Sequence, residues 1–159
     1  MNRLASSLLS SRSRTKFGGV MDQIIPCPLW VSHAGDGRDY RSSLDAGIKA
    51  LLQVAIEEPA LQPPRELIYC RFPLLDGIDN PPEMLSLAIA TAASLIRAHV
   101  PTLICCGAGM SRAPLIAAAG IAVAHGEPLE SCLQQVARCH RCDVSPGLWS
   151  EVRATLSSM

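Results

Sequence analysis

The chain has 159 residues, of which 48% are hydrophobic and 18% are charged. This length and composition predict one folded domain with its own core, and they exclude disorder over most of the chain. No apolar run reaches the roughly 20 residues that a membrane span needs, so we expect no membrane partner.

The charges balance overall but are unevenly distributed. Of the 14 Lys and Arg residues, four lie in residues 1–20, which contain no acid. Residues 21–159 therefore carry ten basic and 14 acidic side chains, and their net charge of −4 predicts no nucleic-acid partner. We interpret residues 1–20 as a disordered basic extension of the domain at residues 21–159. The alternatives are a transit-type targeting segment and a translation start at Met21.

The chain has seven cysteines, an odd number that cannot all pair with one another, and its first residues lack the apolar core of a secretory signal. We therefore expect free thiols in a reducing, cytoplasmic compartment. Cys132, Cys139, His140 and Cys142 are residue types that bind metals, but no second Cys pair stands at zinc spacing. We expect no metal and no other cofactor.

From Met21 onward, short apolar runs alternate with helical periodicity, which indicates an α/β domain. Pro26 and Pro28 interrupt the first apolar run and favour an edge position for that strand. The strands expected in this half span residues 24–32, 48–56 and 66–75, with a turn at 33–39 and a short helix at 40–47.

The second half of the chain predicts one more strand and four helices. Apolar residues recur at helical spacing from Met84 to His99, after two prolines that suit a helix start. The remaining elements are a central strand at residues 101–106 and helices at 112–124, 129–139 and 146–156. The predicted fold is a mixed four- or five-stranded sheet flanked by helices.

The stretch Cys106-Gly107-Ala108-Gly109-Met110-Ser111-Arg112 carries the chemistry, because it joins the central strand to a helix. Backbone N–H groups of such a loop converge on one point, and the helix dipole adds positive potential there. The glycines allow close approach of the backbone to a ligand. We therefore predict that residues 107–112 bind an anion.

Cys106 and Arg112 complete this anion site. The guanidinium of Arg112 can donate two hydrogen bonds to the non-bridging oxygens of a phosphate. The positive field of the loop favours the thiolate form of Cys106, which is a nucleophile.

This run resembles the Cys-x5-Arg signature of the cysteine-based protein tyrosine phosphatases, in particular the small atypical dual-specificity branch. Three further segments resemble that branch: PLWVSHAGDGRDYRSSLDAGIKALLQVAIEEP near the start, PLLDG before the long helix, and RCDVSPGLW near the end. The resemblance covers residues 24–157. It implies a dual-specificity phosphatase-like fold and makes residues 21–159 the catalytic domain.

The resemblance also implies roles for single residues. Cys106 is the nucleophile, Arg112 binds the phosphate, and Asp76 in PLLDG is the general acid, with Asp79 as the alternative. Ser111 helps to order the loop or the transferred phosphate through its hydroxyl group.

Two positions depart from the family pattern. Cys105 stands where the family usually has His, which removes one contribution to thiolate stabilisation and loop order. Ala113 stands where the family has Ser or Thr, whose hydroxyl assists breakdown of the phosphoenzyme.

The expected function is hydrolysis of phosphotyrosine or phosphoserine/threonine in proteins through a cysteinyl-phosphate intermediate. One alternative is a non-protein phosphomonoester, such as a phosphoinositide, a glucan phosphate or an RNA 5′ phosphate. Against lipid and RNA, residues 107–111 contain no Lys or Arg, which polyanionic substrates usually require. The other alternative is a phosphate-binding pseudophosphatase, which the changes at Cys105 and Ala113 leave open. The presence of Cys106, Arg112 and Asp76 together argues against it, because a binding protein has no use for the acid.

Overall fold

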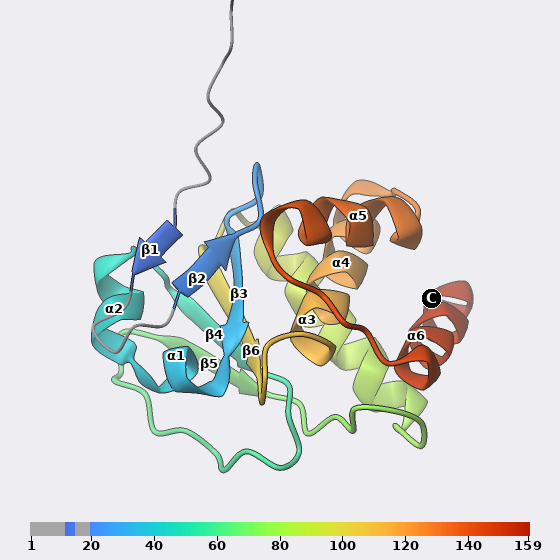
Figure 1. Cartoon of the computed structure of the whole chain (residues 1–159), viewed down its shortest axis with the longest axis horizontal. Coiled ribbons are helices and arrows are strands. Elements are labelled where there is room, and N and C mark those ends of the chain that lie inside the picture. Colours follow the sequence, from blue (N-terminus) through green and yellow to red (C-terminus); the bar gives the residue numbers. More distant parts are fainter. Residues whose placement is uncertain (1–11, 15–19) are drawn as a thin grey trace, which may run out of the picture.

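The computed structural model describes residues 12–14 and 20–159, and within them six strands form one mixed sheet (Figure 1). The strand order is β1-β2-β3-β6-β4-β5, in which β3, β6, β4 and β5 are parallel and β1 and β2 add antiparallel strands beside β3. The strands are β1 Arg12–Arg14, β2 Val20–Gln23, β3 Leu29–His33, β4 Ala50–Gln53, β5 Ile68–Arg71 and β6 Thr102–Cys106.

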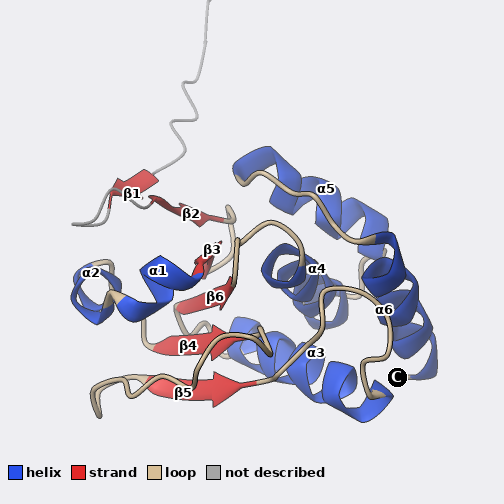
Figure 2. Ribbon diagram, turned by 60° about the horizontal axis from the view of Figure 1, so that its bottom comes forward, coloured by secondary structure: helices blue, strands red, loops and turns tan. Residues whose placement is uncertain are grey.

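Helices cover both faces of the sheet. Two short helices lie on one side, and the four longer ones lie on the other (Figure 2). The helices are α1 Ala34–Arg38, α2 Tyr40–Asp45, α3 Pro82–Arg97, α4 Arg112–His125, α5 Leu129–Cys139 and α6 Pro146–Ser158. None of the helices in the described ranges has the length and apolar character that crossing a bilayer requires.

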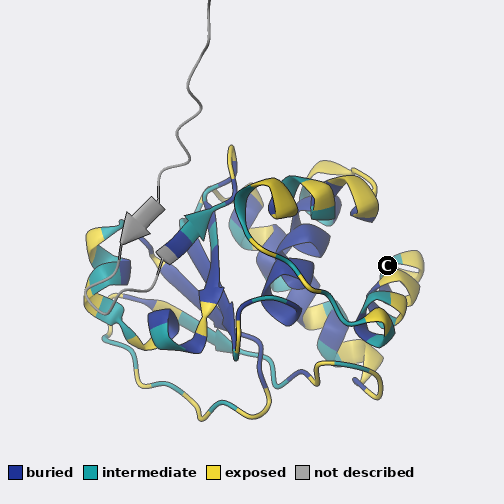
Figure 3. Ribbon diagram, in the orientation of Figure 1, coloured by how far each residue is buried: buried dark blue, intermediate teal, exposed yellow. Residues whose placement is uncertain are grey.

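The central strand β6 is buried along its whole length, and its side chains alternate between two cores. Ile104 and Cys106 belong to the larger core beneath α3 to α6, whereas Leu103 and Cys105 belong to the smaller core on the side of α2. Figure 3 shows β4, β6 and most of α4 as buried, with exposed outer faces on α5 and α6. The two neighbouring cysteines therefore face opposite sides of the sheet.

The predicted fold class is confirmed. The four strands placed from the sequence correspond to β3, β4, β5 and β6, β2 is a fifth, and β1 adds a three-residue strand. The predicted edge position of the first apolar run is wrong: β3 lies between β2 and β6. It begins at Leu29, after Pro26 and Pro28, so neither proline removes a donor from its ladder.

Two other local expectations also change. The turn expected at residues 33–39 contains the single-turn helix α1, whose first N–H groups are capped by the His33 side chain, which accepts from the Gly35 N–H. Strand β2 was not predicted, because its four residues show no period-two pattern.

The prediction of a disordered extension at residues 1–20 falls mainly outside the described residues. Within that segment, Arg12–Arg14 pairs antiparallel with β2 and so extends the sheet. For residues 1–11 and 15–19 the expectation stays a prediction.

Helices α3 and α4 pack closely where Gly120 of α4 meets Ala92 of α3. A Cβ atom built on Gly120 would lie 2.8 Å from the Ala92 Cβ and 3.4 Å from the Ala92 carbonyl carbon. Ala92 is fully buried, so the neighbouring backbone has no room to move away. This contact fixes the distance between the two helices, and α4 begins at Arg112 of the predicted anion site.

We predict that Gly120→Ala lowers the free energy of unfolding by about 1–3 kcal/mol, although Ala is the better helix former by about 1 kcal/mol. Chemical denaturation measures the change. In the Ala92→Gly/Gly120→Ala double variant, the space opened on α3 should restore part of the loss, after allowance for the glycine introduced into a helix. Additive losses in the double variant would contradict this explanation.

Candidate active site

The predicted anion loop lies at the carboxyl ends of the parallel strands, between β6 and α4. Cys106 ends β6 and is 2% exposed, and the loop closes at Arg112, the first residue of α4. The backbone N–H of Ala113 donates to the Cys106 Sγ at 3.4 Å. The sulfur therefore lies over the positive end of α4.

Gly109 holds the curvature of this loop. Its φ is 76°, and a Cβ there would lie 2.7 Å from the His33 backbone nitrogen and 2.7 Å from the Ser32 carbonyl carbon. Both the dihedral angle and the approach to β3 therefore require glycine. The Ala34 N–H also donates to the Gly107 carbonyl at 3.1 Å, so the end of β3 and the start of α1 support the loop from one side.

Arg112 is 5% exposed and is held by two other loops. Its Nη1 donates to the Leu74 carbonyl at 2.9 Å, and Nη1 and Nη2 donate to the two carboxylate oxygens of Glu57. The hydrogen bonds from Arg112 lower the pKa of Glu57, and those same bonds raise the pKa of Arg112. The pair is therefore fully ionised at neutral pH.

One edge of this guanidinium is left over. Of its five N–H groups, Nη1 uses two and Nη2 uses one, and the buried Nε has no hydrogen-bond partner among the described residues. A buried donor without an acceptor costs about 1–3 kcal/mol. The Nε and Nη2 groups lie side by side, in the geometry that binds two oxygens of a tetrahedral oxyanion. Arg112 is thus oriented by Glu57 and Leu74 with one edge ready for an anion.

Of the two candidate acids, Asp76 is the one that contacts the loop. It is exposed, and its Oδ1 accepts from the Ser111 hydroxyl at 2.6 Å. Ser111 accepts in turn from the Ser145 backbone N–H at 3.0 Å. Asp79 is held elsewhere, because its backbone N–H donates to the Glu151 carboxylate of α6 at 2.6 Å. The structure brings Cys106, Ser111, Arg112 and Asp76 together and leaves Asp79 apart.

Sequence reasoning missed Glu57. The sequence patterns assign no role to the segment after β4, although an acid that follows a strand beside β6 lies at the same edge of the sheet as Cys106. A Cβ on Gly107 would lie 2.8 Å from the Glu57 Oε1, which shows how closely this carboxylate approaches the loop.

Cys105 takes no part in the site. Burial raises the pKa of its thiol to about 12, so it stays protonated at neutral pH. It faces α1, where a Cβ on Gly37 would lie 2.6 Å from its sulfur. Cys105 is therefore a neutral packing residue.

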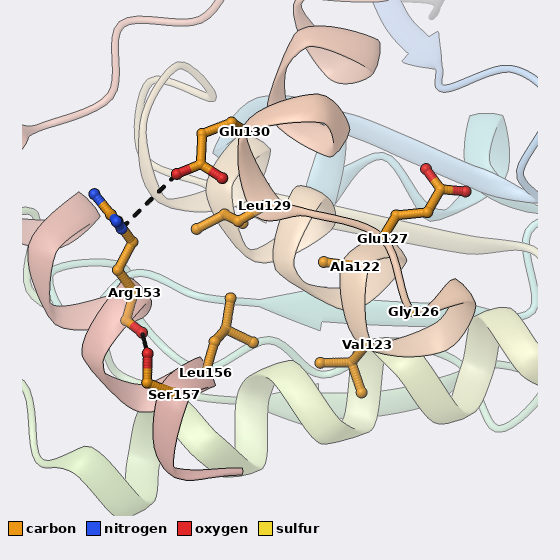
Figure 4. A pocket seen from close by; sticks show the side chains of 9 residues that line it. All are labelled: Ala122, Val123, Gly126, Glu127, Leu129, Glu130, Arg153, Leu156 and Ser157. Atoms are coloured by element: carbon orange, nitrogen blue, oxygen red, sulfur yellow. Dashed lines mark hydrogen bonds and ion pairs between the residues drawn. The ribbon is translucent and has the colours of Figure 1, made fainter.

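A cavity of about 350 Å³ lies between α4, α5 and α6 (Figure 4). Its charged side chains are Glu127, Glu130 and Arg153, and Arg153 pairs with Glu130 at 3.8 Å. Its α4 residues begin at Ala122, about 15 Å along the helix axis from Arg112. Two acids and one paired cation suit an anion poorly, so this cavity is not an extension of the phosphate site. Within residues 12–14 and 20–159, no cluster of three or more His, Cys, Asp or Glu side chains is placed to hold a metal ion.

No protein-family model matches the chain, and no curated protein matches its sequence. Solved structures match its fold. Human DUSP28 has a TM-score of 0.75 and 21% identity, over 86% of this chain and 96% of that one. A mouse putative dual specificity phosphatase complexed with zinc tungstate has a TM-score of 0.76 and 18% identity, over 98% and 94%. The human tyrosine phosphatase-like serine/threonine/tyrosine-interacting protein has a TM-score of 0.72 and 15% identity, over 87% and 97%.

These matches show that the chain has the dual-specificity phosphatase fold. The resemblance inferred from the sequence is confirmed at the level of the fold.

We predict that Glu57→Gln lowers the free energy of unfolding by about 1–2 kcal/mol at pH 7, because it leaves the buried Arg112 charge without its counter-ion. Half of the Glu57 side chain is exposed, which keeps the loss in the lower part of the usual range. Urea denaturation measures it. The matched control is Glu58→Gln, whose pair with Arg38 is at the surface and should change stability by about 0.5 kcal/mol or less.

The stability difference between the wild type and Glu57→Gln should also depend on pH, in a direction that the pKa of Glu57 determines. The pKa of Glu57 is lower in the folded protein than its ordinary value of 4.5. Its stabilisation is therefore fully present above that value and is lost as the pH falls through the lower, folded-state pKa. The stability gap between wild type and Glu57→Gln should close in acid, and a gap that stays constant down to pH 3 would contradict the ion pair.

Proposed function

We propose that the chain is a phosphomonoester hydrolase that acts on phosphotyrosine or phosphoserine/threonine of proteins through a cysteinyl-phosphate intermediate. The observation that carries the proposal is the free Nε–Nη2 edge of the buried Arg112, which begins α4 next to Ala113, whose backbone N–H donates to the Cys106 sulfur. A nucleophile and a bidentate oxyanion donor at one helix N-terminus are what phosphoryl transfer requires.

In the first step, the Cys106 sulfur attacks phosphorus and the bond from phosphorus to the ester oxygen breaks. Arg112 and the loop N–H groups stabilise the three equatorial oxygens. Asp76 donates its proton to the leaving oxygen, so that an alcohol or a phenol departs instead of an anion.

In the second step, the ionised Asp76 accepts a proton from water, which attacks the phosphocysteine. The bond from sulfur to phosphorus breaks, inorganic phosphate leaves, and the Cys106 thiolate is regenerated. The Ser111 hydroxyl supports both steps, because it holds the Oδ1 of Asp76 while the second oxygen stays available to carry the proton.

The comparison structures bear on the proposal in two ways. The mouse phosphatase was solved with tungstate, a tetrahedral oxyanion with the shape of phosphate, which makes tungstate a suitable probe for this site. The human phosphatase-like interacting protein shares the fold, which supports the alternative of a module that binds phosphate without turnover. Ala113 favours that alternative, because only its backbone N–H reaches the Cys106 sulfur and no side-chain hydroxyl is present there.

Hydrolysis of an aryl phosphate tests the proposal directly. Cys106→Ser should retain tungstate binding and less than about 1% of wild-type turnover, because a hydroxyl lacks thiolate nucleophilicity while Arg112 is unchanged. Arg112→Lys should lose both, since an ammonium group cannot donate to two oxygens in parallel. Wild-type protein that binds tungstate and hydrolyses no phosphotyrosine, phosphothreonine, phosphoinositide, glucan or RNA phosphate would favour the pseudophosphatase.

The role of Asp76 depends on the leaving group. We predict that Asp76→Asn slows hydrolysis of a phosphotyrosine peptide by about 10²-fold but changes the rate on an activated aryl ester much less, because a good leaving group needs little protonation. Asp79→Asn is the matched control and should leave both rates near wild type. The reverse pattern would make Asp79 the acid.

A further inference from the structure

The segment between α5 and α6 runs along the outside of the phosphate loop and binds three consecutive residues of it. The His140 Nε2 bonds the Gly109 carbonyl, and the Asp143 N–H donates to the Met110 carbonyl at 2.8 Å. The Ser145 N–H donates to the Ser111 hydroxyl at 3.0 Å. The contact of the His140 side chain with the Gly109 carbonyl has no role in the proposed chemistry.

His140 has two partners, and both accept hydrogen bonds. Its Nδ1 lies 2.8 Å from the Asp22 Oδ2 on β2, and its Nε2 bonds the Gly109 carbonyl oxygen. A carboxylate and a peptide carbonyl can only accept, so each contact calls for a proton on its ring nitrogen. This arrangement of acceptors suits a doubly protonated ring beside Asp22. The two side chains are 11% and 14% exposed, so water screens the pair only weakly.

The contact with Gly109 has a consequence on the opposite side of the peptide bond. In a trans peptide, the carbonyl of one residue and the N–H of the next point in opposite directions. Holding the Gly109 carbonyl outward turns the Met110 N–H inward, and the Asp143 contact does the same for the Ser111 N–H. Ala34 holds the Gly107 carbonyl in the same way on the other side of the loop.

The charge of His140 adds to this orientation. A cation at the Gly109 carbonyl polarises the peptide group and makes the Met110 N–H a stronger donor. Asp22 is the charged group that contacts the imidazole from a packed element, and Arg141 and Asp143 neighbour it along its own segment. Residue 105 supplies no positive charge to the loop, because it is a neutral, buried Cys.

We propose that His140, held as an imidazolium by Asp22, is a positioning residue that orients the N–H groups of the phosphate loop for oxyanion binding. The identity of the substrate rests on the proposed function, whereas the contacts of His140 concern oxyanion binding alone. Strand β2 takes part in the site through this pair, although it lies two strands away from β6 in the sheet.

Tungstate binding and imidazole NMR test the proposal without relying on turnover. At pH 7, both ring nitrogens of His140 should show the ¹⁵N shifts of protonated nitrogen, and in Asp22→Asn one of them should lose its proton. His140→Phe should weaken tungstate binding by about tenfold or more, and Asp22→Asn should weaken it by a smaller factor. His125→Phe is the control, since His125 is exposed and far from the loop along α4, and it should bind as wild type.

Three outcomes would overturn the positioning role: a wild-type His140 with one unprotonated nitrogen, tungstate affinity within twofold of wild type in His140→Phe and Asp22→Asn, or no tungstate binding by the wild type. Asp22→Asn decides the matter if His140→Phe does not fold, because Asn keeps the size of the side chain. Turnover is measured separately. A wild type that binds tungstate through His140 but hydrolyses no ester would refute the hydrolase and leave the positioning role standing.

Discussion

The ion pair between Arg112 and Glu57 is the interaction on which the arrangement of the site depends. Arg112 is 5% exposed and could not stay buried and charged without a partner. The Glu57 carboxylate accepts one hydrogen bond each from Nη1 and Nη2, and the Leu74 carbonyl accepts the second one from Nη1. Only the edge formed by Nε and Nη2 is then left for a ligand. Because Glu57 is half exposed, forming the pair costs less desolvation free energy than forming a fully buried ion pair.

The same pair joins three segments that are distant in the sequence. The Ile56 N–H donates to the Leu74 carbonyl, so the residue before Glu57 is bound to the strand end that leads into Asp76. The Asp76 carboxylate in turn accepts a hydrogen bond from the Ser111 hydroxyl of the loop. Glu57, Arg112 and Asp76 are thus held in one closed set of contacts. A displacement of any one segment is therefore transmitted to the other two.

The sequence predicts the parts of this protein that are set by local patterns. Helical spacing and proline position locate α3 and α6, and the strand-glycine-helix order around Cys106 locates the anion loop. The contacts of Glu57 and His140 are different in kind, because they join Arg112 and Gly109 to residues 55 and 31 positions away. Such pairs follow from strand order and from how α5 ends, which no periodicity encodes. The position of β3 was mispredicted for the same reason, since a proline before a strand does not determine its neighbours.

The charges around the loop limit which phosphates the site can favour. Glu57 neutralises Arg112, and residues 107–111 contain no Lys or Arg, so the side chains of the loop contribute little net positive charge. Under the proposed function, attraction for a phosphate dianion comes from the N–H groups, the α4 dipole and the imidazolium proposed at His140, all of which converge on one oxyanion. A second phosphate on the same molecule would approach a chain whose residues 21–159 carry a net charge of −4. This distribution suits a single phosphate on a neutral or basic carrier and works against lipids and nucleic acids with several phosphates.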